Sequence, residues 1–303
     1  MNKLTDTELK SLIKQSETLE LNEESRKKLG GEYVKTPMGT THYELKGEGE
    51  AIVLVHGYAS PFCIYDKVYY KLVELGYKVL RYDLFGRGFS DRLPEKNSVD
   101  FFAKQLKEVT DALLGDESFI LMGTSMGGAV SATYIKNNPG RVKKLVCLAP
   151  AGMDSLKPPF YMYLSSCPVV GDILFKIMGA KILIKATQRE LYFCPQEEQD
   201  EFTRKVAQAC SYRGFLRSTI SSLRNTIMKT KKSTLGYKAV AEQNIPVLLI
   251  WGTIDKTMPY YQHERFLEVC PQTEFVSFEG SGHNFLYDQG DRTFETIKDY
   301  LQR

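Results

Sequence analysis

The sequence lacks long apolar runs and carries little excess charge. No run approaches the roughly 18 apolar residues of a membrane-spanning helix, and the first residues lack the apolar core of a signal peptide. The net charge is only +3 over 303 residues, which gives no signal for nucleic-acid binding. These absences predict a cytoplasmic protein with no membrane span and no nucleic-acid partner.

Cysteine and histidine are also scarce. The six cysteines stand apart without C-x-x-C spacing, and several lie in apolar runs, so reduced thiols are expected rather than disulfide bridges. Only four histidines are present, which leaves few candidates for a general base. The remaining composition, 43% hydrophobic and 25% charged, is typical of a globular enzyme.

Expected strands alternate with helical patterns along most of the chain. Continuous apolar runs of the type buried in parallel sheets cover residues 51–55 and 78–82. A short apolar run covers 119–122, further strands are expected over 142–149, 246–251 and 273–278, and a hairpin over 32–45 precedes them all. Helices are expected near 66–75 and over 99–114. This order predicts an α/β fold with a mostly parallel, doubly wound sheet.

One long stretch breaks the alternation. After residue 149 the spacing is helical for roughly a hundred residues, which is too long for a loop. Helices are expected near 170–191, 196–210 and 214–229. Because ligands of open α/β sheets bind beyond the carboxyl ends of the strands, an insertion there would cover the site. We predict a helical arm over 1–31, an α/β core over 32–151 and 245–303, and a helical lid over 152–244.

A strand, a sharp turn and a helix are predicted around Ser125. Gly123 and Gly127 flank this serine in the pattern G-x-S-x-G, because so tight a turn leaves no room for a Cβ on either side. The turn would hold Ser125 at a helix N-terminus, where backbone N–H groups favour a developing oxyanion. We interpret Ser125 as a nucleophile; a chance occurrence of the pattern is the alternative.

A serine hydroxyl needs a histidine to take its proton and a carboxylate to orient that histidine. His283 lies in the loop G-S-G-H-N directly after the last predicted strand, and we interpret it as the base rather than as a surface histidine. Asp255 follows the preceding strand, as the order serine, acid, histidine requires. Asp255 as a helix cap near Pro259 is the competing interpretation, and Asp154 is the reserve candidate.

The oxyanion hole needs two backbone N–H groups aimed at the carbonyl oxygen. Met126 follows the nucleophile and supplies one. Tyr58 follows His56 and Gly57 at the end of a predicted strand, and we expect its backbone N–H to supply the other. The tyrosine side chain has no role in this interpretation.

The ordered motifs H-G-Y, D-L-F-G-R-G-F-S-D-R, G-T-S-M-G-G, W-G-T-I-D and G-S-G-H-N resemble those of the lidded α/β-hydrolase superfamily over about residues 32–303. The closest resemblance is to carboxylesterases and monoacylglycerol lipase-like enzymes. In that family the loop represented here by Asp83, Gly86, Gly88 and Ser90 shapes a wall of the site. The resemblance implies hydrolysis through an acyl-enzyme, with no metal ion and no cofactor.

Departures from related families narrow the reaction. Epoxide hydrolases and haloalkane dehalogenases of this fold have aspartate in the place of Ser125, which disfavours both. Carbon–carbon bond hydrolases share S-M-G-G but often have tryptophan after the catalytic histidine, where this chain has Asn284. We predict cleavage of a small-molecule or lipid-like ester. A thioesterase, a carbon–carbon hydrolase and a non-catalytic binding protein on the same scaffold remain alternatives.

The predicted lid is basic and rich in apolar side chains. Residues 152–244 hold 14 Lys and Arg against 8 Asp and Glu. A positive field over the site would attract anionic substrates or an anionic lipid surface, whereas a solvated cationic face is the plainer interpretation. Its apolar residues would suit a medium-chain or monoacyl ester, with small or aromatic esters as the alternative. Peripheral membrane contact stays open, as does the oligomeric state.

Overall fold

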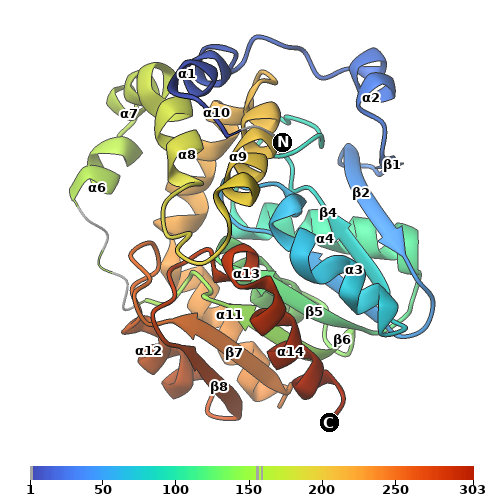
Figure 1. The fold of residues 1–303 in the computed structure, drawn as a ribbon. Helices are drawn as coiled ribbons and strands as arrows, with labels where there is room; N and C mark the ends of the chain where they lie inside the picture. Colours follow the sequence, from blue (N-terminus) through green and yellow to red (C-terminus); the bar gives the residue numbers. More distant parts are fainter. Residues whose placement is uncertain (1–2, 155–156, 158–159) are drawn as a thin grey trace.

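The computed structural model describes residues 3–154, 157 and 160–303, with the backbone alone at Tyr161 (Figure 1). Eight strands form one sheet in the order β1-β2-β4-β3-β5-β6-β7-β8. Strand β2 is antiparallel to both its neighbours, and the other pairings are parallel. The strands are β1 Glu32–Lys35, β2 Thr40–Lys46, β3 Ala51–Val55, β4 Lys78–Tyr82, β5 Phe119–Thr124, β6 Val142–Leu148, β7 Val247–Gly252 and β8 Thr273–Phe278. The predicted hairpin and mostly parallel sheet are confirmed.

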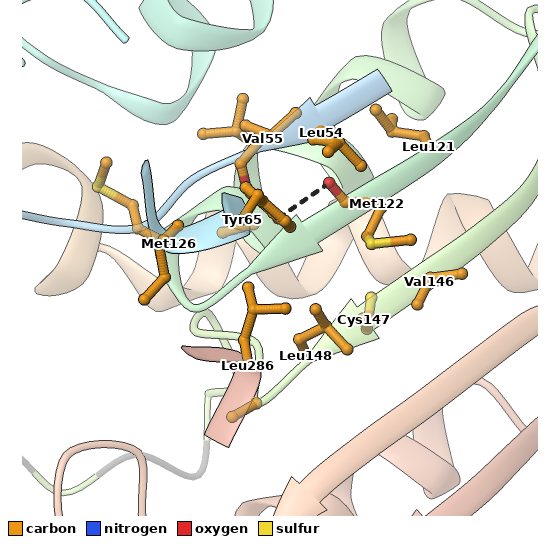
Figure 2. Close-up of a cluster of buried hydrophobic side chains, with 14 of the residues drawn as sticks. Leu54, Val55, Tyr65, Leu121, Met122, Met126, Val146, Cys147, Leu148 and Leu286 are labelled. Atoms are coloured by element: carbon orange, nitrogen blue, oxygen red, sulfur yellow. Dashed lines mark hydrogen bonds between the residues drawn. The ribbon is translucent and has the colours of Figure 1, made fainter. Parts of the chain in front are cut away.

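The centre of the sheet is buried on both faces. Every residue of β3, β5 and β7 is buried, which is why these strands read as continuous apolar runs rather than as alternating ones. The Tyr65 hydroxyl donates hydrogen bonds to the carbonyls of Val55 and Met122, at 2.9 and 3.3 Å, and so links the ends of β3 and β5 (Figure 2). This rigid centre positions the loops that follow both strands.

Helices cover both faces of the sheet, as the doubly wound pattern predicts (Figure 1). One layer holds α3 Asp66–Glu74, α13 Phe285–Asp288 and α14 Gly290–Leu301, with the short 3-10 turn η1 Phe62–Tyr65 before α3. The other holds α4 Val99–Leu114, α5 Met126–Asn137, α11 Thr230–Glu242 and α12 Gln262–Val269. Among the described residues, no helix is both long and apolar enough to cross a membrane.

Residues 152–244, which we name the helical insertion, separate β6 from β7. They include α6 Phe160–Ser166, α7 Val170–Leu174, α8 Ala180–Ala186, α9 Gln196–Cys210, α10 Phe215–Ser222 and α11. The single helix predicted near 170–191 is divided by a π-helical turn, η2 Phe175–Gly179, and a second such turn, η3 Leu223–Ile227, follows α10. The predicted helix over 196–210 is correct, whereas the helix over 160–166 was not predicted.

Helix α11 belongs to the layer on the sheet rather than to the helices above it. A Cβ at Gly236 would lie 2.9 Å from the backbone of Ala132, so glycine lets α11 approach α5 closely. The Tyr237 hydroxyl donates to the carbonyl of Ala151 at 2.9 Å. The helices that stand clear of the sheet are therefore α6 to α10.

The N-terminal arm packs against the helical insertion through α1 and the residues directly after it. Helix α1 Asp6–Lys14, capped by the Thr5 side chain, contacts α8 and α9, and α2 Glu23–Leu29 leads into β1. The backbone N–H of Leu4 donates to Asp200 at 2.7 Å. The apolar side chains of α1 pack against the buried core.

Candidate active site

Ser125 stands in a strained turn between β5 and α5. Its backbone has φ 52° and ψ −121°, a conformation that a residue with a Cβ rarely adopts. The Ser125 N–H donates to the carbonyl of Leu148 at 2.9 Å, which fixes the turn against β6. The strain is typical of a nucleophile elbow, in which the serine is presented above the sheet.

The two flanking glycines are required by close backbone contacts. A Cβ at Gly123 would lie 2.6 Å from the carbonyl carbon of Gly127, and a Cβ at Gly127 would lie 2.0 Å from the carbonyl oxygen of Val55. The steric reason given for the G-x-S-x-G pattern is therefore met in the fold. A Cβ at Gly57 would lie 3.7 Å from Ser125 Oγ, so the serine faces the loop that follows β3.

His283 and Asp255 form a short hydrogen-bonded pair. His283 Nδ1 lies 2.7 Å from Asp255 Oδ2, and the Asp255 side chain is buried. A proton on Nδ1 leaves the lone pair of Nε2 free to accept a proton from a hydroxyl. Asp255 Oδ1 accepts from the backbone N–H groups of Thr257 and Met258, at 2.9 and 2.7 Å. The carboxylate thus both orients the histidine and caps the following turn.

The helix after Asp255 begins later than predicted. Helix α12 starts at Gln262, not near Pro259, because residues 256–261 form turns held by Asp255 and by backbone bonds. Asp255 is therefore not the cap of this helix, whose N-cap is Tyr261; its Oδ1 caps only the turn at Thr257 and Met258.

Charge around the pair favours the protonated imidazole. Burial alone would lower the pKa of His283, but the carboxylates of Asp255 and Glu190 outweigh it and hold the pKa above its usual value of 6.5. Burial, together with the charge of Glu190, raises the pKa of Asp255 in spite of the nearby histidine. A general base with a raised pKa is active only when the pH is high enough to leave it neutral.

Ser125, Asp255 and His283 follow β5, β7 and β8 and so share the carboxyl edge of the sheet. Among the residues that the structure describes, Ser125 Oγ makes no hydrogen bond to His283. Leu286, three residues beyond His283, belongs with Met126 to one buried cluster (Figure 2). The structure thus pairs His283 with Asp255 and places all three loops at one edge of the sheet. It does not join Ser125 to His283 by a hydrogen bond.

The predicted oxyanion donors lie on ordered peptides. Met126 is fully buried as the first residue of α5. The Gly57 carbonyl, which belongs to the peptide that carries the Tyr58 N–H, accepts a hydrogen bond from His56 Nδ1 at 2.9 Å. The Tyr58 carbonyl accepts from Arg87 Nε at 2.8 Å. The peptides on both sides of Tyr58 are therefore held in place.

The sequence analysis did not predict that His56 supports this arrangement. Its Nε2 accepts the backbone N–H of Leu84 at 2.8 Å, so its Nδ1 carries the proton that it donates to Gly57. Complete burial lowers the pKa of His56 to about 4, which keeps the ring neutral. The signal that pointed to it was its position in H-G-Y, directly before the predicted oxyanion donor.

The reserve carboxylate Asp154 and the two remaining histidines, His42 and His263, have structural partners. Asp154 forms an ion pair with Arg265 at 2.8 Å, on the outside of the protein. His42 Nδ1 lies 2.7 Å from buried Asp83, and His263 bonds to a carbonyl within its own turn. No group of three or more His, Cys, Asp or Glu side chains in the described part of the chain is arranged to hold a metal ion.

Fold and site geometry together define an α/β-hydrolase. The profile of the family described as serine aminopeptidase, S33, matches residues 48–290. The chain belongs to this family, and thereby to the α/β-hydrolase superfamily that its motifs resemble.

Individual relatives span nearly the whole chain. The "AB hydrolase superfamily protein YisY" of Bacillus subtilis is 29% identical over 276 residues, which is 89% of this chain and 98% of the relative. A 2-hydroxy-6-oxononadienedioate/2-hydroxy-6-oxononatrienedioate hydrolase of Dechloromonas aromatica is 26% identical, over 86% of this chain and 90% of its own length. The solved esterase EaEST of Exiguobacterium antarcticum superposes with a TM-score of 0.75 at 22% identity and covers 90% of this chain and 100% of its own. The esterase likeness supports the fold.

Proposed function

We propose that the protein is a serine hydrolase that cleaves carboxylic esters through an acyl-enzyme. The observation that carries this proposal is the 2.7 Å bond between His283 Nδ1 and buried Asp255, at the same sheet edge as the strained Ser125 elbow. Membership of a hydrolase family supports an enzyme, and the site supplies the groups that acyl transfer requires.

In this mechanism Ser125 Oγ attacks the ester carbonyl while His283 Nε2 takes its proton. Asp255 stabilises the resulting imidazolium, and the N–H groups of Tyr58 and Met126 stabilise the oxyanion. His283 then gives the proton to the leaving alcohol as the ester bond breaks. Water, activated by the same histidine, cleaves the acyl-enzyme and restores Ser125.

The helical insertion acts in this proposal as a lid that selects the acyl group. Large apolar side chains are exposed along its first helices: Phe160, Leu164, Val169, Ile173, Ile177 and Ile182. Exposed Lys176, Lys181 and Lys185 lie among them. Apolar side chains with interspersed lysines suit a lipid-like ester and peripheral contact with an anionic membrane surface.

A carbon–carbon bond hydrolase is the second candidate, because four of the relatives carry names of that kind. Asn284 occupies the position where such enzymes often have tryptophan, and its side chain donates to the carbonyl of Arg189 at 3.0 Å. That bond ties the residue after His283 to the insertion. A thioester is a third candidate substrate, because its cleavage uses the same acyl transfer to serine.

A series of p-nitrophenyl esters of increasing acyl length, assayed beside a monoacylglycerol and a vinylogous diketone, tests the proposal. We expect turnover of esters that is abolished in Ser125→Ala, with longer chains preferred over acetate. Activity that falls steadily beyond acetate would remove the lipid-like substrate but keep the esterase. Turnover of the diketone without ester hydrolysis would select the second candidate, and no turnover of any substrate would favour a binding protein.

A further inference from the structure

A short segment of the helical insertion is fastened to the two loops that carry Asp255 and His283. We name this segment, residues 189–194 between α8 and α9, the strap. Its buried side chain, Glu190, accepts the backbone N–H of His283 at 2.8 Å and that of Lys256 at 3.0 Å, both on Oε2. The hydroxyl of Thr257 donates to Oε1 at 2.7 Å. One carboxylate therefore bridges the acid loop and the base loop.

The strap is also held from the opposite direction. Asp288, a buried residue five positions beyond His283, accepts the backbone N–H groups of Tyr192, Phe193 and Cys194 at 2.9, 2.9 and 2.8 Å. Glu190 of the insertion thus binds loops of the core, and Asp288 of the core binds the strap. Of these two carboxylates, only Glu190 bonds to both the Asp255 loop and the His283 loop.

Backbone geometry indicates that the position of Glu190 is tightly determined. Glu190 has a φ of 61°, in the left-handed region that residues with a side chain rarely adopt. A Cβ at Gly282 would lie 2.6 Å from Glu190 Cβ, so the loop before His283 can meet the strap only because residue 282 is glycine. Unfavourable backbone conformations persist where surrounding contacts fix them, and they concentrate at functional sites.

The charge of Glu190 is not neutralised by a basic side chain. Its partners among the described residues are two backbone N–H groups and one hydroxyl, and it forms no ion pair with lysine or arginine there. The same carboxylate contributes to the raised pKa values of His283 and Asp255. A buried negative charge without a cation stabilises a positive charge that develops beside it.

We propose that Glu190 is a positioning residue through which the helical insertion controls the His283–Asp255 pair. It holds the two loops in register and favours the imidazolium that forms during proton transfer. This proposal rests on the proposed function, since it needs His283 to act as a base. It assigns to the insertion a part in the chemistry as well as in covering the site.

The test compares Glu190→Gln with Asp288→Asn in the full-length protein. Both variants remove a charge from the strap contact, but only the first changes a group that bonds to both catalytic loops. We expect Glu190→Gln to lower kcat for p-nitrophenyl acetate by roughly 10- to 100-fold, the cost of a small misplacement of a catalytic group. We expect the acid limb of its kcat/KM profile to move to lower pH. Asp288→Asn should leave that limb where it is.

Nuclear magnetic resonance separates this proposal from the proposed function. The imidazole of His283 can be titrated in a Ser125→Ala background, where no turnover is needed, and His283→Gln assigns its signal among only four histidines. Glu190→Gln should lower the titration midpoint, and Asp288→Asn should not. If Glu190→Gln fails to fold, Glu190→Asp keeps the charge and should titrate nearer to the parent than Glu190→Ala. Equal midpoints in all folded variants would overturn the proposal, whether or not the protein hydrolyses esters.

Discussion

The sheet core and the helical insertion use apolar residues in different ways. In the core, β3, β5 and β7 bury every side chain, and the polar residues of the site follow where such strands end. In the insertion, Ile177 and Phe160 keep 74% and 80% of their surface exposed. Burial in the core fixes the strand ends that carry the proposed site, whereas the exposed apolar residues of the insertion are available for contact with a substrate or a surface.

The largest effect should come from the core carboxylate that orients the base. Asp255→Asn lets an amide donate to His283 Nδ1, which places the proton on Nε2 and removes the base. We expect kcat for a p-nitrophenyl ester to fall by about four orders of magnitude. Asp154→Asn, which changes the reserve carboxylate at its surface ion pair with Arg265, is the matched control and should retain activity. Similar losses in both variants would show that the wrong carboxylate has been assigned.

The next largest effect should come from shortening a buried side chain on a core strand. Leu121 on β5 is fully buried, so Leu121→Ala should lower the free energy of unfolding by about 2–5 kcal/mol through lost burial and a cavity. Urea denaturation followed by circular dichroism measures it. A loss below about 1 kcal/mol would contradict the view that β5 is a rigid support for Ser125.

Protonation of His56 should destabilise the core below neutral pH. Its pKa falls from 6.5 to about 4 on burial, so between these values the unfolded chain binds a proton that the folded protein does not. The stabilisation is fully present above pH 6.5 and is lost as the pH falls toward 4, by about 3 kcal/mol in total. Denaturation at several pH values measures this slope.

Removal of the imidazole tests this assignment. His56→Gln should flatten the dependence of the unfolding free energy on pH. A slope that survives His56→Gln would assign the acid sensitivity to another group.

The smallest stability effect should come from the insertion. Ile177→Ala should change the free energy of unfolding by no more than about 0.5 kcal/mol, because most of that side chain is already in water. The same variant should bind vesicles of anionic phospholipid less well and should lose preference for long acyl chains. Strong destabilisation without a change in either property would show that the insertion packs as the core does.

The sequence predicted the sheet core because its strands follow from local patterns. Apolar runs marked β3, β5 and β7, whereas β8, with the pattern T-E-F-V-S-F, is only partly buried. The residues at the strand ends pointed to the loops that carry Ser125, Asp255 and His283, whose catalytic roles stay predictions. The π-helical turns of the insertion had no such signal, because a continuous apolar pattern does not show where an extra residue enters a turn. Glu190 was invisible for a different reason: its partners lie 66 to 93 positions away and are mainly backbone N–H groups.

Covalent labelling with a fluorophosphonate, mapped by mass spectrometry, tests the central claim most directly. If His283, oriented by Asp255, activates the serine of the elbow, the adduct forms on Ser125, and His283→Ala removes it while the protein stays folded. A folded protein that takes no label, that is labelled at another residue, or that is labelled equally well after His283→Ala would contradict the account.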